Sequence, residues 1–159
     1  MKKEIILLGD SIMAWNKFNN FKNYAEPGFT TLDLLWKLQK NNDIIGDVAI
    51  LMIGVNDILL DCSFQMVGEN IEKILKLLKK RFKKIVLISI LPTSDKIKNN
   101  NILIVNKNLK NIQGIFFLDA YDLFLGDSTK IDNKFTGDGI HLNDYAYKIL
   151  NKKIEEALQ

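Results

Sequence analysis

Four short apolar runs recur along the chain, and each is followed by a polar break. A run of this kind, without alternation of apolar and polar positions, is typical of a strand buried on both faces of a parallel sheet. The runs are Ile5–Leu8, Asp47–Ile53, Ile85–Leu91 and Gly114–Leu118. Because segments with helical spacing separate these runs, we predict a parallel sheet with helices on both faces.

A shorter strand around Lys22–Ala25 would bring the number of strands to five. Right-handed crossovers between parallel strands restrict the topologies that such a sheet can adopt. We therefore predict an α/β protein of three layers, α/β/α, whose five-stranded parallel sheet has the strand order 2-1-3-4-5. The length of 159 residues is typical of one domain, and we expect residues 1–159 to form it.

The segments between the predicted strands carry apolar residues at helical intervals. Thr30 or Thr31 can cap a first helix, with apolar positions predicted at Leu32, Leu35, Trp36 and Leu38. Further helices are predicted over Phe64–Phe82, Ile102–Ile112, and Asn143 or Asp144 to Leu158. We expect Tyr121–Phe135 to be irregular and Thr93–Asn101 to be a polar, mobile loop, and the sequence leaves open whether this loop closes over a substrate.

Composition narrows the classes of function. The chain is 47% hydrophobic and 26% charged, and 22 Lys and Arg residues against 19 Asp and Glu residues give a net charge of +3. Arg81 is the only arginine, so the bidentate contacts typical of nucleic-acid recognition are nearly absent. We expect no nucleic-acid partner. The basic cluster Lys79–Lys84 fits the cationic end of a helix, although a phosphate or membrane-surface patch remains an alternative.

Cysteine content and hydropathy bear on the compartment. Cys62 is the only cysteine, which excludes a disulfide within the chain and fits a reducing environment. The apolar run at Ile5–Leu8 is too short for the hydrophobic region of a signal peptide. Since no run approaches the length of a membrane span, we expect a cytoplasmic protein without stable membrane insertion.

Polar and glycine-containing breaks stand at the ends of the predicted strands and before the last helix. They are Gly9–Ser11, Gly28, Gly54–Asp57 and Asp138–His141. The carboxyl ends of parallel strands share one edge of the sheet, and open α/β sheets bind their ligands there. We therefore expect the side chains of these four segments to converge on a site at this edge.

His141 is the only histidine, and so the single candidate for a general base beside Ser11. A serine hydroxyl is a weak nucleophile at neutral pH and needs such a base. Asp138 lies three residues before His141 and can accept a hydrogen bond from Nδ1, which leaves Nε2 free. Ordinary interpretations exist as well. Asp10 and Ser11 are common helix caps, and a lone histidine near a helix start often has no chemical task.

Asn56 and Gly28 are candidates for stabilising an oxyanion. Asn56 can offer its side-chain amide alongside the backbone N–H groups of Ser11 and Gly28, and losing one such donor typically costs roughly 3 kcal/mol of transition-state stabilisation. The alternatives are that Asn56 is a turn residue and that Gly28 only serves a backbone with positive φ.

In this order and at this spacing, the four segments resemble the motif blocks of the SGNH hydrolases, also called GDSL-type esterases and lipases. Leu8–Ser11 contains Gly-Asp-Ser, Gly28 stands at the glycine of the second block, Gly54–Asp57 reads Gly-x-Asn-Asp, and Asp138–His141 reads Asp-x-x-His. Together the blocks cover nearly the whole chain, and the combination is far more specific than Gly-Asp-Ser alone.

The chain departs from the usual pattern of this family at two places. Ile12 replaces the leucine that commonly follows Gly-Asp-Ser, and Glu26 and Pro27 precede Gly28 where many relatives carry small or polar residues. Asn106, in the predicted helix after the fourth strand, is a weaker echo of a family position.

The resemblance implies a flavodoxin-like fold and ester hydrolysis through an acyl-serine. It implies that Ser11 is the nucleophile, His141 the base and Asp138 the orienting acid, with Gly28 and Asn56 joining Ser11 as oxyanion donors. It implies no cofactor and no metal. The chain is short for the family, so we expect an open cleft and small-molecule esters with small acyl groups, such as acetylated sugars or aryl esters.

Alternatives remain at this stage. An enzyme for longer acyl chains, such as a lysophospholipase or thioesterase, would need an acyl pocket, which Trp15, Phe18, Phe21 and Phe29 would line if they do not simply pack on the core. A non-catalytic binding domain can share the fold, although no triad member is missing. A nucleotide-binding domain lacks support, because neither Gly-x-Gly-x-x-Gly nor a P-loop is present.

Overall fold

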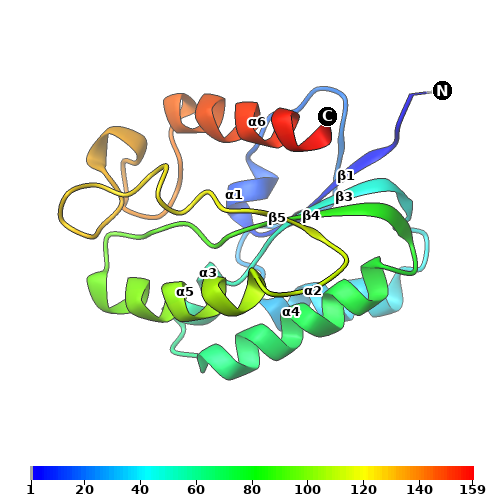
Figure 1. Ribbon diagram of the computed structural model, residues 1–159, viewed down its shortest axis with the longest axis horizontal. Helices are drawn as coiled ribbons and strands as arrows, with labels where there is room; N and C mark the ends of the chain where they lie inside the picture. The colour runs from blue at the N-terminus through cyan, green and yellow to red at the C-terminus, as the bar shows by residue number, and fades with distance from the viewer. Residues whose placement is uncertain (1) are drawn as a thin grey trace.

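The computed structural model describes residues 2–159 and contains a five-stranded sheet between two layers of helices (Figure 1). All neighbouring strands are parallel. Their order is β2-β1-β3-β4-β5, which confirms the predicted topology. The strands are β1 (Ile5–Gly9), β2 (Lys22–Asn23), β3 (Gly46–Met52), β4 (Phe82–Ile88) and β5 (Phe116–Leu118).

Helices cover both faces of the sheet. Figure 1 shows α1 and α6 on one face and α2, α4 and α5 on the other, where α3 also lies. The helices are α1 (Ser11–Ala14), α2 (Thr31–Lys40), α3 (Val55–Leu59), α4 (Phe64–Leu78), α5 (Lys96–Leu109) and α6 (Asp144–Leu158), with a short 3₁₀ helix, η1 (Asn133–Phe135). The segment between β5 and α6 is otherwise largely irregular, as predicted.

The central strands are buried because both of their faces meet helices. Leu7, Leu8, Ile50, Leu51, Val86 and Leu87 are fully inaccessible to solvent. Burial of side chains of this size stabilises a fold by about 1.5–3 kcal/mol each. The carboxyl ends of β1 and β3 therefore lie in a close-packed layer. The chain segments that follow these two strands are anchored to a rigid part of the fold.

The junction between α4 and β4 lies earlier in the chain than predicted. Helix α4 ends at Leu78 and β4 begins at Phe82, whereas the sequence pattern placed Phe82 in the helix. Phe82 is buried and pairs with Gly46 of β3. The sequence pattern did not indicate the start of this strand, because the polar residues Lys83 and Lys84 interrupt the apolar run.

The expectation of a mobile loop at Thr93–Asn101 is wrong for most of that stretch, since α5 starts at Lys96. Asp95 caps it, accepting hydrogen bonds from the backbone N–H groups of Ile97 and Lys98 at 2.9 and 3.1 Å. The first turns of α5 carry mostly polar side chains, which is why no apolar stripe indicated the helix. Helix α3 was likewise not anticipated.

Helix α2 is rotated relative to the predicted orientation. Thr31, Leu34, Leu35 and Leu38 face the core, whereas Leu32 and Trp36 are 39% and 52% exposed. The Thr31 hydroxyl donates to the buried Asp57 carboxylate at 2.6 Å. This polar contact and the buried leucines lie on the same face of α2 and together favour the observed rotation.

The basic cluster Lys79–Lys84 holds backbone carbonyl groups. Lys79 donates to Gln113 O, Arg81 to Leu38 O and Lys84 to Ala157 O, at 2.7, 2.9 and 2.5 Å. The last two carbonyls lie near the ends of α2 and α6, where a cation is favourable. These contacts support the structural interpretation of the cluster. Within residues 2–159, none of the helices has both the length and the apolar character that crossing a bilayer requires.

Candidate active site

The turn after β1 places Ser11 at the carboxyl edge of the sheet. Gly9 ends the strand against β3, and a Cβ atom at this position would lie only 2.1 Å from the carbonyl oxygen of Met52. A residue with a side chain would therefore push the two strands apart. Ser11 is the first residue of α1, so its backbone N–H has no acceptor within the helix.

Asp10 caps α1 from a buried position. Its Oδ1 accepts a hydrogen bond from the Ile12 N–H at 3.0 Å, while its Oδ2 is buried and has no partner within residues 2–159. Burial raises the pKa of Asp10 to about 7. The capping interpretation therefore holds for Asp10, whereas the Ser11 side chain points to a different partner.

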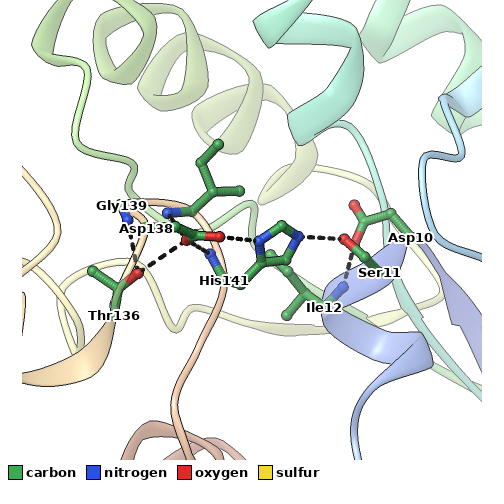
Figure 2. Close-up of polar contacts among 8 residues, drawn as sticks. Asp10, Ser11, Ile12, Thr136, Asp138, Gly139 and His141 are labelled. Atoms are coloured by element: carbon green, nitrogen blue, oxygen red, sulfur yellow. Dashed lines mark hydrogen bonds and ion pairs between the residues drawn. The ribbon is translucent and has the colours of Figure 1, made fainter.

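That partner is His141, 130 residues away along the chain. Ser11 Oγ lies 2.9 Å from His141 Nε2, and His141 Nδ1 lies 2.5 Å from Asp138 Oδ2 (Figure 2). The structure thus brings together the three residues that the spacing singled out. In this arrangement the carboxylate can hold Nδ1–H, and Nε2 can receive the hydroxyl proton.

The carboxylate of Asp138 is surrounded by donors. Its Oδ1 accepts from the backbone N–H groups of His141 and Ile140 at 2.8 and 2.9 Å, and from Thr136 Oγ1 at 3.4 Å. Partial burial raises its pKa, but the hydrogen bonds from the His141 side chain and from these two backbone groups outweigh burial and lower the pKa well below its usual range. Asp138 is therefore ionised at neutral pH.

Two residues that the sequence did not indicate support this loop. Thr136 Oγ1 accepts from the Gly139 N–H at 2.9 Å, and the Ser94 N–H donates to Gly139 O at 2.8 Å. Gly139 has φ +83°, and a Cβ atom there would lie 2.3 Å from Ser94 Oγ. The loop before α6 can therefore pack on the β4–α5 connection only with glycine at this position.

Asn99 in turn anchors the segment that carries Ser94. Its Oδ1 accepts from Thr93 N and Thr93 Oγ1 at 2.8 and 3.0 Å. Its Nδ2 donates to Thr93 O and Thr129 O, both at 2.9 Å. All four hydrogen-bonding positions of this buried amide are used. One side chain of α5 thus ties the β4–α5 connection to the irregular segment after β5.

Gly28 and Asn56 lie in segments joined to the nucleophile turn, but neither is bonded to Ser11. Glu26 N–H donates to Gly9 O at 3.0 Å. Asn56 Nδ2 donates to the carbonyl of Phe29 at 2.9 Å, so Asn56 fixes the residue next to Gly28. Gly28 has φ +80°, as its ordinary interpretation required. The contribution of both residues to an oxyanion site stays a prediction.

Asp57, the last residue of the Gly-x-Asn-Asp segment, has a structural partner. Its carboxylate accepts from the backbone N–H and hydroxyl of Thr31 at 2.9 and 2.6 Å, and Asn70 donates to the same hydroxyl at 3.0 Å. Burial raises the pKa of Asp57. Its contacts join the start of α2 to α3, next to Asn56.

The four aromatic residues considered for an acyl pocket do not act as a group. Phe18 and Phe21 stack on each other with ring centroids 4.4 Å apart, and both pack, like Phe29, against the core. Trp15 differs, because it is 50% exposed and its ring centroid lies 4.4 Å from that of His141. Only Trp15 of this set lies against the Ser11–His141 pair.

The surface beside His141 is open. A hollow of about 240 Å³ is lined by Gly137, Asp138, His141, Leu142 and Asn143. Across residues 2–159, no group of three or more His, Cys, Asp or Glu side chains is arranged to hold a metal ion.

Comparison with known proteins places this geometry in a family. The model of the GDSL-like lipase/acylhydrolase family matches residues 7–149. A curated relative, N-acylneuraminate cytidylyltransferase from Streptococcus agalactiae, is 27% identical over 94% of this chain, which spans only 37% of the relative's length.

Solved structures share the fold. A member of the lipolytic protein G-D-S-L family from Veillonella parvula superposes with a TM-score of 0.83 at 21% identity, covering 96% of each chain. The acetyl xylan esterase AlAXEase superposes with a TM-score of 0.78 at 19% identity, covering 98% of this chain and all of the other. With the family model matched over most of its length, the chain belongs to the GDSL-like lipase/acylhydrolase family, the SGNH hydrolases.

Proposed function

We propose that this protein is a serine esterase that hydrolyses small carboxylic esters through an acyl-serine intermediate. The observation that carries the proposal is the continuous chain of hydrogen bonds from Ser11 Oγ through His141 to Asp138, at 2.9 and 2.5 Å. Family membership supports the reaction class. A binding domain without catalysis would not need this chain to be complete.

In the first step, Ser11 Oγ attacks the carbonyl carbon of the ester while its proton passes to His141 Nε2. Asp138 holds Nδ1–H and balances the imidazolium charge. The tetrahedral intermediate collapses as the C–O bond to the alcohol breaks, and His141 returns the proton to the departing oxygen. Water then attacks the acyl-serine by the same route, which releases the carboxylic acid and restores Ser11.

Three donors are proposed for the negative charge of the tetrahedral oxygen. The Ser11 N–H is free of helical hydrogen bonds because Ser11 is the first residue of α1. Asn56 uses one amide hydrogen on Phe29 O and keeps the other for the oxyanion. The Gly28 N–H completes the set, since Gly28 precedes the residue that Asn56 holds. Such preorganised donors contribute typically 2.7–4 kcal/mol each.

The substrate class that we favour is an ester between a small carboxylic acid and a hydroxyl group of a sugar. The surface beside His141 is open, with a hollow of about 240 Å³ that His141 lines and Ser11 does not. A long acyl chain needs an enclosed apolar channel to leave water. One structural neighbour is named an acetyl xylan esterase, an enzyme for an acetylated carbohydrate. The curated relative is named for N-acylneuraminate, whose acyl group is an amide, so its name supports a carbohydrate ligand but not an ester.

Labelling with a fluorophosphonate probe tests the mechanism. Wild-type protein should gain one adduct on Ser11, and Ser11→Ala should gain none. The Tm of the variant should equal that of wild type. Ser63→Ala is a matched control, because Ser63 caps α4 by accepting from Met66 N–H, far from His141 in the sequence. Labelling of Ser11→Ala to the wild-type extent would refute the proposed nucleophile.

A series of p-nitrophenyl esters tests the acyl length. We expect kcat/KM to be highest for acetate and to fall as the chain grows beyond four carbons. A maximum at eight or more carbons would instead favour the lysophospholipase or thioesterase alternative.

A further inference from the structure

Trp15 lies one helical turn after the proposed nucleophile. Its backbone N–H donates to Ser11 O at 2.9 Å, which is the i to i+4 relation of neighbouring turns. Residues at this spacing share one face of a helix, and a helical side chain leans back over the preceding turn. Trp15 itself is the cap residue after α1, and its ring contact with His141, the partner of Ser11 Oγ, places the indole beside the Ser11–His141 pair.

The indole both contacts His141 and remains half exposed. Its ring centroid lies 4.4 Å from that of His141, with the two planes tilted by 40°. The side chain is nevertheless 50% exposed. A large apolar ring left this open to water is unfavourable by itself, and the neighbouring aromatic residues Phe18 and Phe21 are used in packing instead.

We propose that Trp15 is the platform on which the sugar ring of the alcohol portion stacks during ester hydrolysis. The inference rests on the proposed function and adds a substrate-binding residue to it. A substrate whose carbonyl reaches Ser11 has its alcohol portion within a few ångströms of His141, which must protonate the leaving oxygen. That portion therefore lies beside the ring packed against His141.

A one-sided platform suits a pyranose better than an aryl group. A pyranose can lay axial C–H groups of either face on the indole, while its rim of hydroxyls remains in water and hydrates the outer side of the ring. An aryl ester exposes two apolar faces and would leave one of them wet on this surface. Aromatic contacts of this kind contribute enough to change affinity about tenfold.

The test compares two acetyl esters whose alcohols differ. Wild type, Trp15→Ala and Trp15→Phe are assayed on a monoacetylated methyl xylopyranoside and on ethyl acetate, which has no ring. We expect wild type to prefer the sugar ester, and Trp15→Ala to raise KM for it about tenfold with kcat little changed. For ethyl acetate, Trp15→Ala should lower kcat/KM by a clearly smaller factor than for the sugar ester, and Trp15→Phe should recover most of the affinity for the sugar ester.

Other outcomes would contradict the proposed role of Trp15. An equal loss of kcat on both esters would mean that Trp15 only holds the His141 ring, and no change on either ester would mean that it has no part in binding. A wild-type protein without preference for the sugar ester also contradicts the inference. Failure of the proposed function is distinct, because wild-type protein would then hydrolyse neither ester and Ser11 would not react with the fluorophosphonate.

A binding readout independent of turnover is available. The chain has two tryptophans, and Trp36 lies on α2, exposed on the opposite face of the sheet from α1. In Trp36→Phe, fluorescence reports on Trp15 alone. Methyl xylopyranoside at millimolar concentration should change that emission in a saturable way, and phenol should do so more weakly. A non-saturable response to the sugar, or a stronger saturable response to phenol, contradicts the inference.

Discussion

Two aspartates flank the proposed catalytic pair, and their carboxylates are in opposite situations. Asp10 precedes Ser11, is 1% exposed and leaves one oxygen without a partner within residues 2–159. Asp138 precedes His141 by three residues, is exposed, and accepts hydrogen bonds at both oxygens. Burial raises the pKa of Asp10 to about 7, whereas the hydrogen bonds to Asp138 overcome the effect of its partial burial and lower its pKa.

The difference reflects how each half of the site is built. The nucleophile turn is held by close packing at the end of a buried strand, so its position tolerates a poorly solvated carboxylate. The His141 loop is irregular and is held by directed polar contacts from Thr136, Ser94 and, through Thr93, Asn99. Changes in the first half should therefore alter stability through charge burial, and changes in the second should alter geometry.

The largest effect is expected for Asp138→Asn. An amide at this position can place its NH₂ group toward Nδ1, which favours the tautomer with the proton on Nε2 and leaves no base for Ser11. Loss of this orientation typically lowers kcat by roughly 10³–10⁴-fold. Asp132→Asn is the control, because Asp132 lies on the same irregular segment and its carboxylate contacts Lys134, accepting from the backbone N–H at 3.0 Å and lying 3.6 Å from Nζ. Steady-state kinetics on p-nitrophenyl acetate measures kcat for both variants. A loss of kcat below tenfold in Asp138→Asn would contradict the role of Asp138.

A second, smaller effect is expected for Asn99→Ala. The substitution removes four hydrogen bonds and leaves the N–H and C=O groups of the buried Thr93 without the partner they have now. At 1–3 kcal/mol for each orphaned group, the free energy of unfolding should fall by about 4 kcal/mol. Urea denaturation measures this loss.

The same variant should also lower kcat several-fold, since Ser94 would no longer hold Gly139 firmly. Asn100→Ala, at an exposed position on the same helix, should change neither quantity. If Asn99→Ala were as stable as wild type, the view that polar contacts hold this half of the site would be wrong.

The same contrast explains what could be predicted from the sequence. Buried strands such as Asp47–Ile53 were evident because their apolar runs are continuous, and the pairing of Ser11 with His141 was evident because no rival histidine exists. No feature of the sequence indicated the contacts of Ser94, Thr136 and Asn99. These are common polar residues whose partners are set by the path of a loop, and no periodicity encodes that path. The exposure of Trp36 was missed for a related reason, since the Thr31–Asp57 contact, which favours the observed rotation of α2, has no signal in the sequence.

The smallest effect is expected at Asp10, and it depends on pH. In the unfolded chain this carboxyl loses its proton near its ordinary value of 3.8, whereas in the folded protein it keeps the proton up to about pH 7. Between these values the unfolded state binds fewer protons, so wild-type stability should fall as pH rises from about 4 to 7 and then level off. His141, Asp57 and the Tyr147 hydroxyl are the titratable groups whose charges couple to Asp10, and all three remain in the variant.

Asp10→Asn removes this titration but keeps an oxygen for the Ile12 N–H. The stability of the variant relative to wild type should therefore increase by on the order of 3 kcal/mol between pH 4 and pH 8, whatever the constant cost of the amide. Denaturation at several pH values measures that difference, and Asp43→Asn, at an exposed position, should show none. A relative stability of Asp10→Asn that is flat from pH 4 to 8 would mean that Asp10 is well solvated or paired in the folded state. The two aspartates would then not differ as their surroundings require.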